Sequence, residues 1–181
     1  THSDSSAASD VYKRQELRKL NYLSCLAALR VFKSTTNHAL SIKWPNDIYL
    51  DNKKVSGILI ESQSSGKDIF LSIGIGINID IDESFNVNQP HSNLGTNINY
   101  TKLIYLFCNN LVNFLNTENY DELVKEFNDN LFAINKRISI SIDNVINEGV
   151  LLGINDYGEL MINTGNNVLT INDINSTLRM I

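Results

Sequence analysis

Cysteine and histidine are scarce in this chain, and neither is arranged as a metal site. Cys25 and Cys108 are far apart and stand among apolar residues of helical periodicity, which predicts two buried free thiols and no disulfide. His2, His38 and His91 lack the spacing of metal ligands. The sequence also contains no Gly-x-Ser-x-Gly motif. We therefore predict neither a protein-held metal nor a nucleophilic triad.

Long apolar runs and an excess of positive charge are absent too. No run of 18 apolar residues occurs, which argues against a membrane-spanning helix. The N-terminus has no basic segment followed by an apolar core, so it does not read as a signal peptide. The net charge of -5 argues against a nucleic-acid-binding surface. With 181 residues, 43% of them hydrophobic, the sequence predicts a soluble globular protein of the cytoplasm.

The periodicity of the apolar residues divides the chain into three parts. Residues 1–15 are polar and without period, and we expect them to be disordered or foreign to the fold. Residues 16–134 form the main domain and residues 135–181 a small C-terminal unit. The elements predicted for the main domain are a helix over 16–35, an extended segment over 40–50 broken by Pro45, a turn at Asp51-Asn52, strands Lys54–Ser62 and Ile69–Ile81, a polar loop over 82–100, and helices Lys102–Leu115 and Tyr120–Leu131.

The C-terminal unit has the pattern of short antiparallel strands. Ile138, Ile140 and Ile142 alternate with polar residues, and Asn- and Gly-rich turns separate the segments that follow. About five strands of this kind predict a small β-barrel, which would dock on the main domain because its own core is too small. The fold class is therefore α+β, with a mixed, mostly antiparallel sheet packed against helices and a small barrel at the C-terminus.

The strand Ile69–Ile81 has two contrasting faces. Isoleucines dominate one face, which we expect to pack against helices, whereas Gly74, Gly76 and Asn78 lie on the other. Two glycines at alternate positions remove side chains, so that a bound molecule could lie directly on the backbone next to the Asn78 amide. The alternative is that a helix packs closely on the glycines.

Lys43 stands just before Pro45, where the backbone has little freedom. An ammonium group fixed in this way suits a phosphate or a carboxylate whose charge must be balanced during a reaction. The alternative is a solvated lysine. Asn46 and Asp47 are typical of an Asx-type turn, and we expect Trp44 in the core.

Three blocks in this order and spacing are similar to biotin protein ligases: Lys43–Asp47 (Lys-Trp-Pro-Asn-Asp), Gly57–Glu61 and Gly74–Asn78 (Gly-Ile-Gly-Ile-Asn). The resemblance runs from about Leu17 to Ile181. It implies a catalytic domain related to the class II aminoacyl-tRNA synthetases, followed by an SH3-like C-terminal barrel.

The resemblance implies a two-step reaction. Biotin is first activated by ATP, with magnesium, to biotinyl-5′-AMP, and is then transferred to a lysine of the biotin carboxyl carrier protein or domain of acetyl-CoA carboxylase. By analogy, Lys43 is the catalytic residue and contacts the biotin carboxylate and the phosphate. The residues expected to line the pocket are Gly57, Ile58, Leu59, Gly74, Gly76 and Asn78. Asp47 is a candidate for magnesium.

The sequence departs from the family pattern at one place. Biotin protein ligases carry a Ser/Thr segment and a Gly-Arg-Gly-x-x-Gly-Arg loop upstream, and Thr1–Gln15 stands here in their place. We therefore expect an N-terminally truncated catalytic domain with feeble activity. The alternatives are a lipoate or octanoyl ligase, or a non-catalytic module that binds ligands or dimerises through sheet edges.

Overall fold

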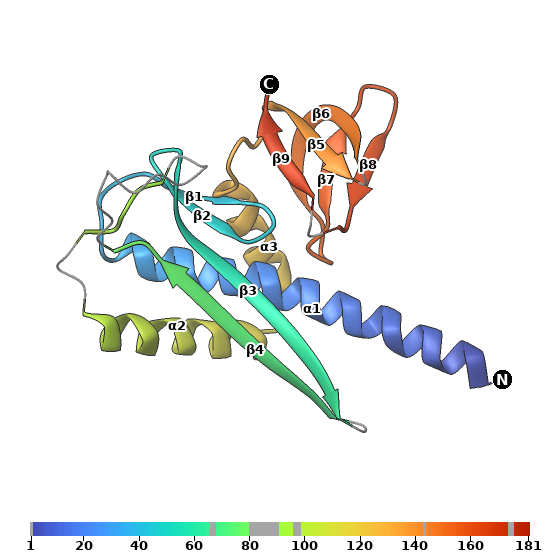
Figure 1. Cartoon of the computed structure of the whole chain (residues 1–181), viewed down its shortest axis with the longest axis horizontal. Helices are drawn as coiled ribbons and strands as arrows, with labels where there is room; N and C mark the ends of the chain where they lie inside the picture. The colour runs from blue at the N-terminus through green and yellow to red at the C-terminus, as the bar shows by residue number, and fades with distance from the viewer. Residues whose placement is uncertain (1, 66–67, 80–90, 96–98, 143, 174–175) are drawn as a thin grey trace.

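The computed structural model describes residues 2–65, 68–79, 91–95, 99–142, 144–173 and 176–181, and gives only the backbone of 2–15, 64 and 68. The end of the predicted strand at 80–81, and residues 82–90 and 96–98 of the predicted loop, lie outside this part. Figure 1 shows a main part with the helices and a C-terminal sheet beside it. The elements are α1 (His2–Lys33), β1 (Leu40–Lys43), β2 (Asp47–Leu50), β3 (Lys53–Ser65), β4 (Asp68–Ile77), α2 (Tyr100–Leu115), α3 (Tyr120–Asp129), β5 (Arg137–Ile142), β6 (Val145–Ile154), β7 (Leu160–Asn163), β8 (Val168–Ile171) and β9 (Thr177–Met180).

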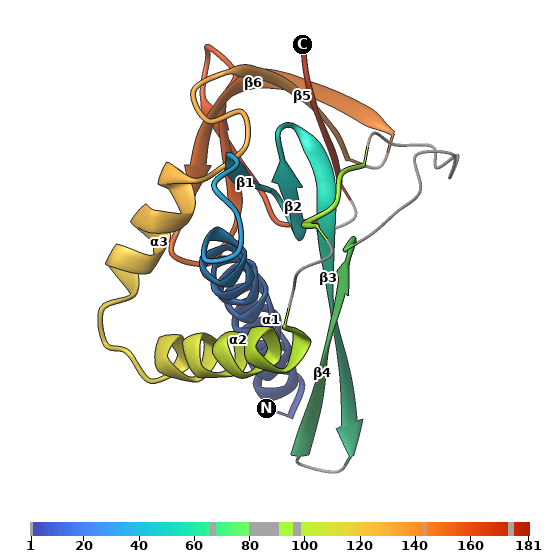
Figure 2. The same ribbon diagram turned by 90° about the vertical axis from the view of Figure 1, so that its left-hand side faces the viewer.

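Helix α1 is the centre of the main part. It contacts α2 and α3 as well as β1, β2 and β3, and Figure 2 shows it between α2 and the sheet. Leu23, Leu26 and Phe32 are completely buried, which confirms that this helix packs on two sides. The helix begins at His2 and not at Glu16. Residues predicted to be disordered are thus helical. Apolar periodicity, on which the prediction depended, starts only after Glu16 and could not reveal this.

The first sheet is antiparallel, with strand order β1-β2-β3-β4. Its inner face packs on α1 through Ile42, Ile48 and Ile58, each of them almost fully buried. Asp51 and Asn52 form the predicted turn between β2 and β3, with φ angles of 48° and 66°. Asp and Asn tolerate this left-handed conformation better than other side chains, which is why the two-residue turn forms here.

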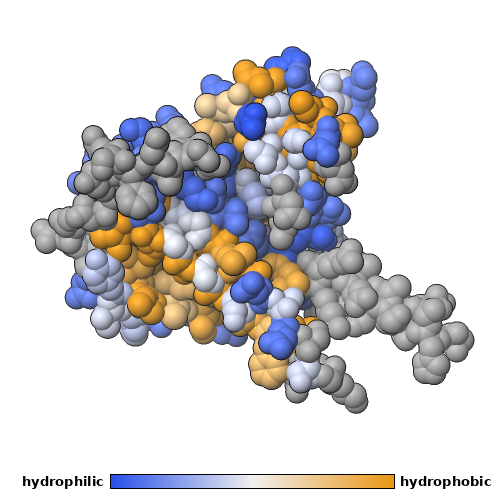
Figure 3. Space-filling model, in the orientation of Figure 1, coloured by the Kyte–Doolittle hydropathy of each residue, from blue (hydrophilic) through white to orange (hydrophobic). Residues whose placement is uncertain are grey.

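The β3–β4 hairpin extends past the helices (Figures 1 and 2). Ile73 and Ile75 pack against the core as predicted, but Ile69 and Leu71 are 42% and 48% exposed. The prediction of an isoleucine face buried along its whole length was therefore wrong for the outer half, since no helix reaches it among the described residues. Figure 3 shows apolar residues gathered at the surface over this region and α2.

Helices α2 and α3 are amphipathic. Their buried residues recur at helical spacing: Leu103, Phe107, Leu111 and Phe114 in α2, and Leu123, Val124 and Phe127 in α3. The Asn99 side chain accepts a hydrogen bond from the Lys102 backbone N–H and caps α2. Cys25 is buried as predicted, whereas Cys108 is exposed because it lies on the outer face of α2. None of the described helices is long and apolar enough to cross a membrane.

The C-terminal strands form an open antiparallel sheet with the order β8-β7-β6-β5-β9. A closed barrel would require its two outermost strands to pair, but in the described residues β8 pairs with β7 and β9 with β5. The prediction of a closed barrel is corrected in this respect. The five short strands are present as predicted, and their core contains Ile138, Leu151 and Ile162.

A side-chain clamp joins α3 to the C-terminal sheet. The Asn128 Oδ1 accepts a hydrogen bond from the Ile154 backbone N–H at 2.7 Å, and the Asn128 Nδ2 donates to the Ile154 carbonyl at 3.2 Å. Gly153 has a φ of 132°, and a β-carbon there would lie 2.7 Å from the Asn128 Oδ1. Only glycine fits beneath the clamp.

We predict that Asn128→Ala lowers the free energy of unfolding by about 1–3 kcal/mol, because it leaves the backbone groups of the buried Ile154 unpaired. Urea denaturation followed by circular dichroism measures this. Asn166→Ala, at an exposed turn position of the same sheet, is the matched control and should change the unfolding energy by less than about 0.5 kcal/mol. Equal effects of the two substitutions would contradict the proposed role of the clamp.

Candidate functional site

Four residues lie in one row across the first sheet. In the strand registers Lys43 is opposite Asp47, Asp47 is opposite Gly57, and Gly57 is opposite Gly76. Cross-strand partners point to the same face of a sheet, so all four belong to the face opposite α1. Leu59 lies on this face too, opposite Gly74, and is 59% exposed. We call this face of the sheet, opposite α1, the open face.

The glycines form a bare floor on the open face. A β-carbon added at Gly74 or Gly76 would come no closer than 3.8 Å to any atom outside the adjacent residues, and would meet only Leu59 and the Gly57 carbonyl. Close packing therefore does not require glycine at either position. No described helix packs on them, so the alternative that a helix covers the glycines is not what the described residues show.

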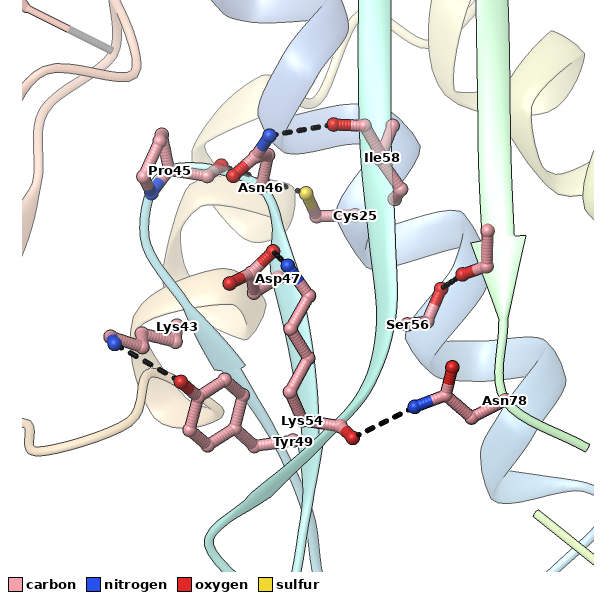
Figure 4. Close-up of polar contacts among 11 residues, drawn as sticks. Cys25, Lys43, Pro45, Asn46, Asp47, Tyr49, Lys54, Ser56, Ile58 and Asn78 are labelled. Atoms are coloured by element: carbon pink, nitrogen blue, oxygen red, sulfur yellow. Dashed lines mark hydrogen bonds and ion pairs between the residues drawn. The ribbon is translucent and has the colours of Figure 1, made fainter. Parts of the chain in front are cut away.

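Lys54 is the residue that sequence reasoning missed. Its Nζ lies 2.6 Å from the Asp47 Oδ1, and its side chain folds over Gly57, where a β-carbon would be 3.2 Å from the Lys54 Nζ (Figure 4). Strict alternation from Gly57 would place Val55 on the open face and Lys54 in the core. A register shift between Ile48 and Tyr49 reverses this, so that Val55 is buried and Lys54 reaches Asp47.

Lys43 is held differently from Lys54. Its Nζ donates a hydrogen bond of 3.0 Å to the Tyr49 hydroxyl, and Figure 4 shows it on the opposite side of Tyr49 from Lys54. The Tyr49 ring packs on Phe132 with ring centroids 5.2 Å apart, so the hydroxyl has a defined position. Around the row of Lys43, Asp47 and Gly57, the open face thus carries two ammonium groups and one carboxylate, a local net positive set suited to an anionic ligand.

Hydrogen bonds to α1 and β3 fix the connection between β1 and β2, which consists of Trp44, Pro45 and Asn46. The Asn46 Nδ2 donates to the Ile58 carbonyl at 2.7 Å, and the Ile58 N–H donates to the Asn46 carbonyl at 2.8 Å. The Asn21 Nδ2 donates to the Pro45 carbonyl at 2.9 Å. Trp44 is 3% exposed, as predicted for a core residue. We expected an Asx-type turn at Asn46, but its amide instead joins the connection to β3.

Ile58 and Asn78 lie at the margin of the open face. The Ile58 side chain points into the core, and both of its backbone polar groups are bonded to Asn46. Ile58 also lines the cavity of about 200 Å³ described below. Asn78 follows the end of β4, and its Nδ2 donates to the Lys54 carbonyl at 3.2 Å. The structure therefore brings Asn78 to the backbone of Lys54.

Two cavities lie near these elements. One of about 200 Å³ is lined by Arg18, Asn21, Pro45, Asn46 and Leu59, among others, and lies between α1 and the β1–β2 connection. A larger one of about 490 Å³ is lined by residues of β1, the 131–136 segment and Met180, but not by Lys43, Asp47, Lys54 or the glycines. The charged row and the bare floor, and not the larger cavity, identify the candidate site. Within the described residues, no group of three or more His, Cys, Asp or Glu side chains could hold a metal.

Comparisons with known proteins agree with this geometry. The model of the Biotin/lipoate A/B protein ligase family matches residues 6–78. The fold is similar to biotin protein ligase from Aquifex aeolicus, at 23% identity and a TM-score of 0.77, over 91% of this chain and 76% of that one. The same Aquifex aeolicus protein in complex with biotin and ATP gives 24% identity and a TM-score of 0.75, over 91% and 72% of the chains. Biotin protein ligase from Leishmania major with biotinyl-5-AMP gives 19% and 0.51, over 84% and 70%.

The structure leads to a prediction about the two cysteine thiols of the chain, Cys25 behind the site and Cys108 on α2. Burial, and secondarily the charge of Asp47, raises the pKa of the Cys25 thiol, so at neutral pH it carries almost no thiolate. We therefore predict that Ellman's reagent titrates one thiol, Cys108, in the native protein and both after denaturation. Cys108→Ser is the control and should leave no reactive thiol. Rapid reaction of Cys25 in the native Cys108→Ser protein would show that the connection behind the site is loose.

Proposed function

We propose that this chain carries the catalytic site of a biotin protein ligase, because residues 6–78 match the model of the Biotin/lipoate A/B protein ligase family. The observation that carries the proposal is the open face, where a floor of glycines lies beside Lys43, Asp47 and Lys54. This arrangement offers an apolar, flat surface next to fixed positive charge. Biotin has a bicyclic ring system with a planar ureido group at one end and a carboxylate at the other, and fits both features.

The reaction proceeds in two steps. A carboxylate oxygen of biotin attacks the α-phosphorus of ATP, and the bond from this phosphorus to the bridging oxygen breaks, releasing pyrophosphate and leaving biotinyl-5′-AMP. The amine of a lysine on the carrier domain then attacks the acyl carbon, loses a proton, and forms an amide while AMP leaves. Neither step requires a protein nucleophile, so catalysis depends on positioning and on charge balance.

The lysines balance the charge in the first step. Biotin carboxylate and the α-phosphate repel each other, and an ammonium between them reduces this repulsion. Lys54 is placed for this role because it lies directly over the glycine floor, where Asp47 holds its Nζ. Lys43, at the end of the row, suits the phosphates that leave. Magnesium would arrive with ATP, and the single carboxylate of Asp47 together with phosphate oxygens is a donor set that magnesium accepts.

The partners follow from the same chemistry. The second step needs a lysine on an exposed part of a carrier domain, which we propose to be the biotin carboxyl carrier protein or domain.

A homodimer through the edge of the first sheet stays a proposal as well. In the described residues β4 has no strand partner on its outer edge, and Phe70 and Leu71 are exposed there. Long apolar edges of this kind favour pairing with another strand.

The test is formation of an acyl-adenylate by this chain. With radiolabelled ATP and biotin we expect slow but biotin-dependent biotinyl-5′-AMP formation, because no Gly-Arg-Gly-x-x-Gly-Arg loop is present to enclose the ligand. The same assay with lipoate or octanoate distinguishes the alternative ligases. A faster reaction with lipoate would replace biotin by lipoate as the substrate, and no adenylate with any acid would leave a non-catalytic binding module.

Substitution of the two lysines tests their roles. Lys54→Ala should slow adenylate formation by about 100-fold or more, the usual effect of removing a group that stabilises transition-state charge. Lys43→Ala should also slow adenylate formation by orders of magnitude, and it should raise the KM for ATP more than the KM for biotin. Lys125→Ala is the matched control, since Lys125 forms an ion pair with Asp129 on the exposed surface of α3. Unchanged turnover by Lys54→Ala would remove Lys54 from the mechanism.

A further inference from the structure

One turn of the C-terminal sheet contacts the β1–β2 connection beside the candidate site. It connects β6 to β7 and consists of residues Asn155–Glu159. The Asn155 Oδ1 accepts hydrogen bonds from the Tyr157 and Glu159 backbone N–H groups, both at 3.0 Å. The Asn155 Nδ2 donates to the Glu159 Oε2 at 2.8 Å. These bonds fix both the backbone of the turn and the direction of the Glu159 carboxylate.

The turn is fitted closely against α1. The other carboxylate oxygen of Glu159, Oε1, lies 3.3 Å from the Arg18 Nη2, and both side chains are more than four-fifths buried. Gly158 has a φ of 75°, and a β-carbon there would lie 2.9 Å from the Tyr22 ring. The turn therefore has no room to shift towards α1, and no residue other than glycine fits at its apex.

The same turn holds the tryptophan beside Lys43. The Trp44 Nε1 donates a buried hydrogen bond of 3.1 Å to the Gly158 carbonyl. Other hydrogen bonds also fix the β1–β2 connection, but these come from α1 and β3 and act on Pro45 and Asn46. The bond to Gly158 acts on Trp44 itself. Arg18, on the other side of the turn, lines the cavity of about 200 Å³ together with Pro45 and Asn46.

We propose that the Asn155–Glu159 turn is a positioning element of the ligase site, in which Gly158 and Glu159 set the placement of Lys43 and Asp47 through Trp44 and Arg18. This inference rests on the proposed function of the site. Asp47 lies only three residues after Trp44, at the other end of the same connection, so a shift of the Trp44 backbone would also change the position of the carboxylate that holds Lys54. The C-terminal sheet would thus contribute to catalysis without a residue that touches the substrates.

The test measures the two site lysines directly and needs no ligand. The native protein is treated with a trace of an amine-acylating reagent, and the labelling rate of each lysine is measured by mass spectrometry. Trp44→Phe removes the indole donor, and Glu159→Ala removes the carboxylate that pairs with Arg18 and accepts from the Asn155 amide. We expect either substitution to raise the labelling rates of Lys43 and Lys54 by about two- to fivefold, the range that corresponds to loss of an exposed or half-exposed ion pair.

Two controls separate positioning from stability. Lys125, which pairs with Asp129 on α3, reports general loosening within the same sample and should keep its rate. Glu148→Ala removes an exposed ion pair with Arg137 elsewhere in the C-terminal sheet, and should change none of the rates. A rise confined to Lys43 and Lys54 supports the proposal. Unchanged rates at these two lysines, or an equal rise at every lysine, would overturn it and make the turn a device of stability alone.

Glu159→Gln supplies a second variant in case Glu159→Ala opens the fold. It keeps the hydrogen bond with Asn155 but removes the charge that faces Arg18, and we expect it to raise the two rates by less than Glu159→Ala does. Equal rates for Glu159→Gln and the wild type, together with a general rise in Glu159→Ala, would count against the proposal. Failure of the adenylate assay would overturn the ligase function and leave these labelling rates measurable, so the two outcomes are distinguishable.

Discussion

The paired hydrogen bonds between Asn46 and Ile58 are the constraint on which the site depends. They join the β1–β2 connection to the middle of β3, so the residues before and after it cannot move independently of the sheet. Lys43 and Asp47 stand at the two ends of this connection. A partly buried pair of bonds of this kind is costly to break, because the backbone groups of the buried Ile58 would lose their partners. The row on the open face is a consequence of this attachment.

The charge arrangement follows from a second constraint, the register shift in β3. It turns Lys54 to the side of Asp47 and buries Val55 in its place. The carboxylate then holds one lysine, while the Tyr49 hydroxyl holds the other. A lysine fixed in advance loses little freedom when an anion binds, which favours charge balance in the transition state over simple attraction in solution.

Sequence patterns predicted the parts of this molecule that depend on short-range periodicity. The glycine face of β4, the buried Trp44 and the amphipathic helices follow directly from spacing. The role of Lys54 did not, because a bulge reverses the alternation on which the prediction depends. The prediction of a closed C-terminal barrel was wrong, because closure depends on the pairing of residues far apart in the chain. The exposure of Ile69 was not predicted, because it depends on how far the helices extend along the hairpin, and the periodicity of a strand carries no information about that.

The composition of the floor bears on the choice between biotin and lipoate. Gly57, Gly74 and Gly76 offer only backbone, and Leu59 adds apolar contact. Such a floor recognises the shape of a flat or extended acyl group but not its hydrogen-bonding atoms, which fits a family whose members use either acid. Discrimination must therefore come from polar groups that approach from above the open face. Under the proposed function, the described part of the chain would supply the charge for activation, and the groups that cover the floor would select the acid.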